Sequence, residues 1–286
     1  MADRHEPGER LGYGEPGVSL EAHRVHGLIG PDPGLNHPAW SAAPPTPRFV
    51  DIGDGHPAPW GTWATVLWDD DVLHVGYRAE EPFVSATSTA RDSLLFFEND
   101  LELFIDGRDA YYELEFTALG TVYEVFFVWR DAYLPGSRWD VPRFDVHRPS
   151  AHSFAGDHPH DRTTFWDGAH PRGTRWAFLD YDLPGMTVDV HVDGRINDDS
   201  HVDAGWTAHV RIPWSGLADL ADGRALPPRD GDVWGMFFGR FQQLKTREPG
   251  RTIGLGYAAN AHGVNDTHLP ESWTQVRFTG SAEISS

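Results

Sequence analysis

Residues 91–129 read RDSLLFFENDLELFIDGRDAYYELEFTALGTVYEVFFVW, and this stretch decides the fold. It holds the densest aromatic and β-branched content in the chain, which is typical of central strands. Breaks with turn-forming residues divide it into short segments. The pattern predicts three strands, at Leu101–Ile105, Tyr111–Phe116 and Thr121–Trp129, joined by turns at Asp106–Asp109 and Leu119–Gly120.

Carboxylates stand among the apolar residues of this stretch, where they are costly unless they face solvent, pair with a cation or bind a ligand. Because side chains alternate along a strand, Glu113 and Glu115 share one face about 6.5–7 Å apart, and Glu102 can join them from the neighbouring strand. That spacing suits a Ca²⁺ site or a pair of acid/base carboxylates. A solvated sheet face with partners such as Arg240 or Arg211 is the third interpretation.

The composition limits the possible partners. The 286 residues carry a formal net charge of −20, which argues against nucleic acid and anionic membrane surfaces and fits a neutral or cationic ligand, bound Ca²⁺, or simply an acidic surface. With no Cys, disulfides and thiolate metal sites are excluded. No run approaches about 18 apolar residues, and no apolar signal region is visible at the start of the chain. We expect a cytoplasmic protein, or a secreted one if a leader has been trimmed.

Short strands separated by turns continue through the rest of the chain, which has 30 Gly and 22 Pro. Alternating patterns predict strands at Trp63–Trp68, Val72–Arg78, Thr187–Val192, Trp206–Ile212, Val233–Phe241 and Trp273–Phe278. The single helical segment is Trp214–Ala221, with Ser215 as a possible cap. Many short strands indicate an all-β fold, an antiparallel β-sandwich. We expect one domain over residues 22–279, between a flexible N-terminal arm, residues 1–21, and a tail, residues 280–286.

Residues 130–185 differ from the rest because their periodicity is weak and they are rich in His, Arg, Asp and Pro. Their aromatic residues provide enough apolar mass to pack, so we expect an ordered loop excursion that caps one end of the sandwich. His158 and His160 could chelate a metal from an extended segment, although histidines in polar loops are more often simply exposed.

Four ordered blocks carry a resemblance to carbohydrate-binding module family 9-like domains. They are HPAW (37–40), ATVLWDDDVLHVGYRAEEP (64–82), ENDLELFIDG with YYELEFTALGTVYEV (98–125), and DGRINDD to GWTAHVRIPW (193–214) with DGDVWGMFFGRF (230–241) and PESWTQVRF (270–278). The resemblance implies an antiparallel β-sandwich, often with structural Ca²⁺, in which a sugar lies between two aromatic rings. It implies the sugar-binding Glu at Glu102 and one ring at Phe96 or Phe97. The second ring is replaced by Thr267 or His268, and Glu115 stands near the position of a sugar-binding Arg.

These observations predict two groups of site residues. The ligand-binding candidates are Glu102, Glu113, Glu115, Arg240, Phe97 and His268. The candidates for a Ca²⁺ site, chosen as oxygen ligands in an acidic loop, are Glu98, Asn99 and Asp100.

The favoured function is non-covalent binding of a saccharide or glycoside through carboxylates, an Arg and aromatic walls. The alternative is a glycoside-processing hydrolase or lyase on the same scaffold, with Glu113, Glu115 or a loop His as acid/base. An interaction protein without a small ligand is the third possibility.

Overall fold

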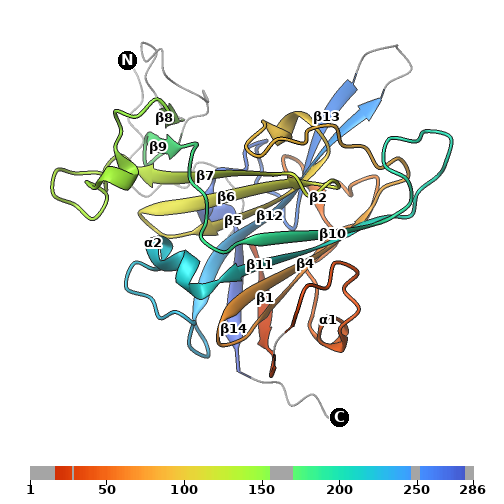
Figure 1. Ribbon diagram of the computed structural model, residues 1–286, viewed down its shortest axis with the longest axis horizontal. Coiled ribbons are helices and arrows are strands. Elements are labelled where there is room, and N and C mark those ends of the chain that lie inside the picture. Colours follow the sequence, from red (N-terminus) through yellow and green to blue (C-terminus); the bar gives the residue numbers. More distant parts are fainter. Residues whose placement is uncertain (1–16, 28, 155–169, 246–251, 281–286) are drawn as a thin grey trace.

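The three central strands are present as β5 (Asp100–Asp106), β6 (Ala110–Thr117) and β7 (Val122–Trp129), and they pair antiparallel. The computed structural model describes residues 17–27, 29–154, 170–245 and 252–280, and Figure 1 shows these strands side by side. In the first turn, the backbone N–H of Arg108 donates to Oδ1 of Asp106 at 2.8 Å. In the second, Gly120 adopts φ +75°, which favours glycine. Both turns lie where the sequence predicts them.

The other strands extend the sheet on both sides of this centre. In hydrogen-bonded order the strands are β10-β11-β4-β3-β1-β14-β12-β5-β6-β7-β9-β8, with β13 paired to β12 and to β2. Their bounds are β1 (Gly17–Arg24), β2 (Val50–Asp51), β3 (Thr62–Trp68), β4 (Val72–Glu80), β8 (Ala151–Phe154), β9 (Arg175–Phe178), β10 (Thr187–Asp193), β11 (Gly205–Pro213), β12 (Val233–Lys245), β13 (Thr252–Ala258) and β14 (Thr274–Thr279). The predicted hairpin of β3 and β4 is confirmed.

Strand β1 departs from the prediction in two ways. It pairs parallel with both β14 and β3, so the sandwich is not purely antiparallel. It also begins at Gly17, so residues 17–21 belong to a strand and not to an arm. Residues 1–16, the remainder of the expected arm, lie outside the described part of the chain, as do residues 281–286 of the expected tail.

The sheet folds over itself into two layers around one large apolar core. The rings of Tyr77 on β4 and Trp206 on β11 contact Phe116 on β6, with centroids 5.5 and 6.1 Å apart. Leu103, Leu114 and other inward side chains of β5, β6 and β7 belong to the same core. The all-β sandwich is therefore confirmed.

A second, smaller apolar cluster covers the outer face of β5, β6 and β7. It includes Phe104, Tyr111, Phe127 and Trp273, and it buries every residue of β6 and β7. The carboxylates on this outer face are consequently not on a solvated surface. Burial on both faces also explains why apolar residues occur on both faces of these strands.

The described part of the 130–185 excursion packs as expected. Phe144 and Tyr181 lie against Phe126 of β7, with ring centroids 5.0 and 4.6 Å apart, and β8 and β9 extend the sheet beyond β7 (Figure 1). The predicted pair His158 and His160 lies outside the described residues.

Helices are short and few in the described ranges. They are α1 (Pro38–Ala42), α2 (Ala218–Ala221) and the 3₁₀ helices η1 (Leu95–Phe97), η2 (Pro142–Phe144), η3 (Trp214–Leu217) and η4 (Pro270–Ser272). The predicted helix Trp214–Ala221 is thus split into η3 and α2. Its cap at Ser215 is wrong, since η3 begins after Pro213 without a side-chain cap. None of the helices in the described chain has the length and apolar content needed to cross a bilayer.

Candidate functional site

Strand register gathers acidic side chains on the outer face of β5 and β6. Glu102 lies opposite Glu115 across the strand pair, and Phe104 lies opposite Glu113. Asp100 precedes Glu102 by two residues and therefore shares its face. On the far side of β6, Tyr123 of β7 lies opposite Glu115. The predicted grouping of Glu102, Glu113 and Glu115 on one face is therefore found in the structure.

A glycine on the neighbouring strand leaves space for one of these carboxylates. Gly239 of β12 lies opposite Glu102. A Cβ at this position would lie 2.6 Å from Oε2 of Glu102 and 2.3 Å from a ring carbon of Phe237. Any larger residue would displace the carboxylate, so the glycine is required for the shape of the site.

Glu102, Glu113 and Glu115 form the floor of a pocket of about 150 Å³, which we call the outer-face pocket, and Asp100 adjoins this floor on the same face of β5. Its lining residues are Phe96, Glu102, Glu113, Glu115, Phe154, Phe241, Asn265, Asp266, Thr267 and His268. Aromatic side chains form its walls, and the segment 265–268 closes one side. The volume is below the roughly 300–1,000 Å³ of sites for drug-sized ligands, so the pocket suits a small molecule or one end of a larger one.

Buried hydrogen bonds hold this segment in place. The guanidinium of Arg175 on β9 donates to the backbone O of His268 at 2.8 Å, and Nε1 of Trp273 donates to the backbone O of Thr267 at 2.8 Å. The hydroxyl of Tyr111 lies 3.1 Å from Nδ1 of His268, and Oε2 of Glu113 lies 3.9 Å from the same nitrogen. His268 therefore lines the pocket. In the sequence, it stands near the position of the second sugar-binding ring that the family resemblance implies.

The carboxylates of the pocket are almost completely shielded from water. Their exposed fractions are 0% for Asp100, 2% for Glu102, 4% for Glu113 and 2% for Glu115. Each has one oxygen that accepts no hydrogen bond from the described residues, namely Oδ2 of Asp100 and Oε2 of the three glutamates. Buried polar atoms are normally hydrogen-bonded, so four such oxygens in one place mark the floor of the pocket as a candidate binding site.

Burial changes the acid–base properties of these groups. Loss of hydration raises the pKa of Glu113 to about 7, and raises the pKa of Glu102 and of Glu115 well above the ordinary range, with repulsion from Asp100 adding to both. Burial also holds the pKa of His268 well below its usual value, with the positive charge of Arg175 as a second cause. The imidazole is therefore neutral at pH 7, and the floor carries fewer charges than its composition suggests.

Arg240 is not part of this pocket, and its predicted place beside Glu102 and Glu115 is wrong. It lies opposite Leu101 of β5 and therefore faces the inner core. Its guanidinium lies 3.1 Å from Oε2 of Glu81, with both side chains only 1% exposed. The physical reason is parity, because residue 240 and Gly239 point to opposite faces of β12.

Phe97 also lies elsewhere than predicted. Its side chain is 68% exposed and does not line the outer-face pocket, whereas its neighbour Phe96 does. The two rings are in contact, with centroids 4.5 Å apart. The aromatic wall that the sequence predicted from this pair is therefore supplied by Phe96.

The three residues of the predicted Ca²⁺ site in the loop, Glu98, Asn99 and Asp100, do not point toward one another. The carboxylate of Glu98 accepts hydrogen bonds from the backbone N–H and hydroxyl groups of Thr87 and Ser88. The amide of Asn99 donates to Glu81 at 2.5 Å, on the inner side of the sheet. Asp100 turns to the outer face and Asn99 away from it, because successive residues of an extended chain point in opposite directions, whereas Glu98 caps η1 before the strand begins.

Sequence reasoning missed several residues in and beside the pocket. Tyr123 lies beside Glu115 without lining the pocket, and its buried hydroxyl has no hydrogen-bond partner among the described residues; it could have been found from its alternation with Val125 and Phe127. Phe154, Phe241 and Asn265 carry no comparable signal, since long-range folding alone brings them to this face.

No protein-family model matches the chain, and no curated protein sequence matches it. Comparison with solved structures finds similar folds. A Bacteroides uniformis protein that is provisionally described as carbohydrate-binding has 13% identity and a TM-score of 0.54, over 92% of this chain and 99% of that one. A family 9 carbohydrate-binding module from Caldicellulosiruptor kristjanssonii, solved with cellotriose, has 10% identity and a TM-score of 0.45, over 94% and 96% of the two chains. The same kind of module with glucose has 10% identity and a TM-score of 0.44, over 92% and 97%. The chain therefore shares the β-sandwich fold of the Bacteroides uniformis protein.

Proposed function

We propose that this protein binds a saccharide or glycoside non-covalently in the outer-face pocket. The observation that carries the proposal is the floor of the pocket, where buried carboxyl groups of Glu102, Glu113 and Glu115 each keep an oxygen without a donor. A ligand rich in hydroxyl groups supplies the missing donors. Hydrogen bonds to carboxylates are among the stronger ones in proteins, so such a floor would orient the ligand.

The walls of the pocket suit the other surface of a sugar. Phe96, Phe154 and Phe241 line it, and the C–H faces of a sugar ring pack well on aromatic side chains. The combination of an apolar wall with a few convergent polar groups is typical of small-molecule sites.

Two further observations support a saccharide. The solved structure from Bacteroides uniformis that shares this fold is provisionally described as carbohydrate-binding. The formal charge of −20 disfavours anionic ligands, and most sugars are neutral.

The test is a calorimetric screen of neutral mono- and oligosaccharides and aryl glycosides against the wild-type protein and Glu115→Gln. The substitution keeps the shape of the side chain but prevents it from ionising, so it removes the carboxylate that donating hydroxyl groups of the ligand would stabilise, and affinity should fall about tenfold or more, corresponding to roughly 1.5–3 kcal/mol. Glu21→Gln on β1 is the matched control, because Glu21 is exposed and lies outside the pocket. Its affinity should equal that of the wild type.

Equal affinity in all three proteins would contradict the proposed site, and the absence of binding to every saccharide would contradict the function. The ligand recovered after incubation distinguishes binding from catalysis. We expect it unchanged; cleaved glycoside would favour the enzymatic alternative.

A further inference from the structure

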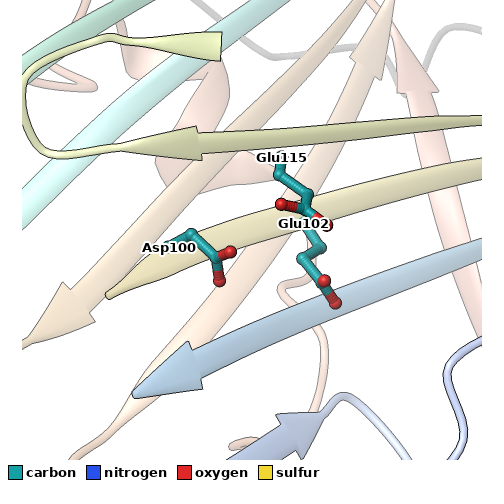
Figure 2. A group of neighbouring side chains, drawn as sticks. All are labelled: Asp100, Glu102 and Glu115. Atoms are coloured by element: carbon teal, nitrogen blue, oxygen red, sulfur yellow. The ribbon is translucent and has the colours of Figure 1, made fainter. Parts of the chain in front are cut away.

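Three carboxylates at the floor of the outer-face pocket converge on one point: Glu102 and Glu115, which line the pocket, and the adjoining Asp100. Asp100 and Glu102 project from β5 and Glu115 projects from β6, and Figure 2 shows all three on the same side of the sheet. One oxygen of each lies within 4.8 Å of the other two. Three buried acids at this separation repel one another strongly if they are charged.

Within the described chain, protein groups offset this charge only in part: the backbone N–H of Phe241 donates to Oδ1 of Asp100 at 3.0 Å. Oδ2 of Asp100, Oε2 of Glu102 and Oε2 of Glu115 lack hydrogen-bond donors. The nearest arginine in sequence register, Arg240, points into the opposite face and is already paired with Glu81.

A separate observation comes from a side chain that is not acidic. The hydroxyl of Tyr123 is buried, has no hydrogen-bond partner, and belongs to a residue that is 2% exposed and lies opposite Glu115. Because residues opposite each other in a strand pair share a face, this register places its side chain beside Glu115 of the cluster. A buried hydroxyl that has no partner in the described chain, on the strand beside Glu115, is a second observation that indicates a ligand at this position.

The chemistry of the three carboxylates indicates which kind of ligand they bind. The three groups offer only carboxylate oxygens, which suit hard cations such as Ca²⁺, Mg²⁺ or Mn²⁺, whereas Zn²⁺ favours nitrogen and sulfur ligands. A Ca²⁺ ion sits about 2.3–2.6 Å from its oxygens, so two ligands on opposite sides of it lie roughly 4.6–5.2 Å apart. The three oxygens lie within 4.8 Å of one another, so one ion of this size can contact all of them.

We propose that Asp100, Glu102 and Glu115 hold one divalent cation of the Ca²⁺ type in the floor of the outer-face pocket, where its open coordination positions take hydroxyl groups of the bound saccharide. Ca²⁺ requires about six to eight oxygens, and three carboxylates supply at most about six of them. The remaining positions face the pocket. The part that concerns hydroxyl groups rests on the proposed function, whereas the cation site does not.

The first experiment measures cation binding without any saccharide. Protein stripped with EDTA and dialysed is titrated with CaCl₂, MgCl₂ and MnCl₂ by calorimetry, and its melting temperature is recorded with and without each ion. We expect one Ca²⁺ per chain and a higher melting temperature, because an ion that binds only the folded state stabilises it. Asp100→Asn and Glu115→Gln should each weaken binding at least about tenfold, since each removes one of three charged ligands.

Glu98→Gln is the matched control, because Glu98 is an acid two residues from Asp100 whose carboxylate is engaged by Thr87 and Ser88. It should bind Ca²⁺ as the wild type does. Absence of binding for all three ions would overturn the cation site. Equal affinity in Asp100→Asn, Glu115→Gln and wild type would also overturn it, by showing only general attraction to an acidic surface.

The second experiment repeats the saccharide titration with Ca²⁺ and with EDTA. Affinity should fall at least about tenfold in EDTA, because the ion supplies direct ligand contacts. If Ca²⁺ binds at this site but saccharide affinity is the same in both buffers, coordination of the hydroxyl groups is wrong while the cation site stands. If Ca²⁺ binds and no saccharide does, the proposed function fails and the cation site is retained.

Discussion

Arg240 and Glu81 show how a single charged pair is accommodated in the inner core. The guanidinium of Arg240 donates to Glu81, to the hydroxyl of Thr62 at 2.8 Å and to the backbone O of Glu80 at 3.0 Å. Glu81 also accepts from Nε1 of Trp206 at 2.8 Å. Burial raises the pKa of Glu81 and lowers the pKa of Arg240, and their mutual attraction opposes both shifts. A network satisfied in this way stabilises the fold only as long as both partners remain.

The first prediction in this network concerns Arg240→Met. Removing the guanidinium leaves Glu81 buried without its cation, so the free energy of unfolding should fall by about 3–5 kcal/mol in urea denaturation. The double variant Arg240→Met with Glu81→Gln should recover part of this loss, because the unpaired charge is gone. Saccharide affinity of the folded single variant should be unchanged. Normal stability with weakened saccharide binding would instead place Arg240 at the ligand.

At the scale of the element, β12 serves two faces with opposite chemistry. Trp234, Met236 and Phe238 fill the inner core, while Phe237 and Gly239 face outward. Gly239 gives Glu102 the room it needs, so this strand shapes the outer-face pocket by the absence of a side chain. The same alternation that removes Arg240 from the pocket brings Gly239 to it.

Gly239→Ala tests this role. The new methyl group would overlap Oε2 of Glu102 and the ring of Phe237, so we expect a loss of about 1–3 kcal/mol in the free energy of unfolding, as in overpacked cores, together with weaker saccharide and Ca²⁺ binding. Gly235→Ala, in the same strand, is the control, because its nearest neighbour would be Cβ of Asp106 at 3.3 Å. If the two substitutions have similar effects, β12 tolerates an added side chain poorly at both positions, and Gly239 has no specific role in shaping the outer-face pocket.

At the scale of the whole molecule, β1 connects the two layers of the sandwich. It lies between β3 and β14 and is parallel to both. Nε1 of Trp68 on β3 donates to the backbone O of Ala22 on β1 at 3.0 Å and to that of Thr279 on β14 at 3.1 Å. One indole therefore links three strands at the junction, and the layers should unfold as a single unit.

Trp68→Phe tests the junction. It removes the shared donor and leaves buried carbonyl oxygens without it, so the free energy of unfolding should fall by about 1–3 kcal/mol beyond the packing loss. Trp234→Phe is the control, because its Nε1 is buried without a hydrogen-bond partner and both indoles have an arginine over the ring. Both variants should retain one transition in urea, and the first should be the less stable. Equal stability would contradict the role of this hydrogen bond.

Local patterns in the sequence were enough to predict much of the fold and part of the site. Alternation along Leu101–Ile105 and Tyr111–Phe116, with turns at fixed positions, placed Glu102, Glu113 and Glu115 on one face, because a side chain's face depends only on its position within a strand. The same rule, applied to the apolar set Trp234, Met236 and Phe238, points Arg240 inward. This alternation in the sequence therefore indicates that Arg240 faces the core, against the prediction that it reaches these glutamates.

Other features were decided by the tertiary structure alone. That Glu81 is the partner of Arg240, that β1 runs parallel between β3 and β14, and that the segment 265–268 covers the outer face all depend on contacts between residues far apart in the chain. The pairing of distant strands is set by the packing of the whole core, and no local periodicity encodes it. Burial of the carboxylates follows from that covering segment, and with it the difference between a solvated acidic face and a binding pocket.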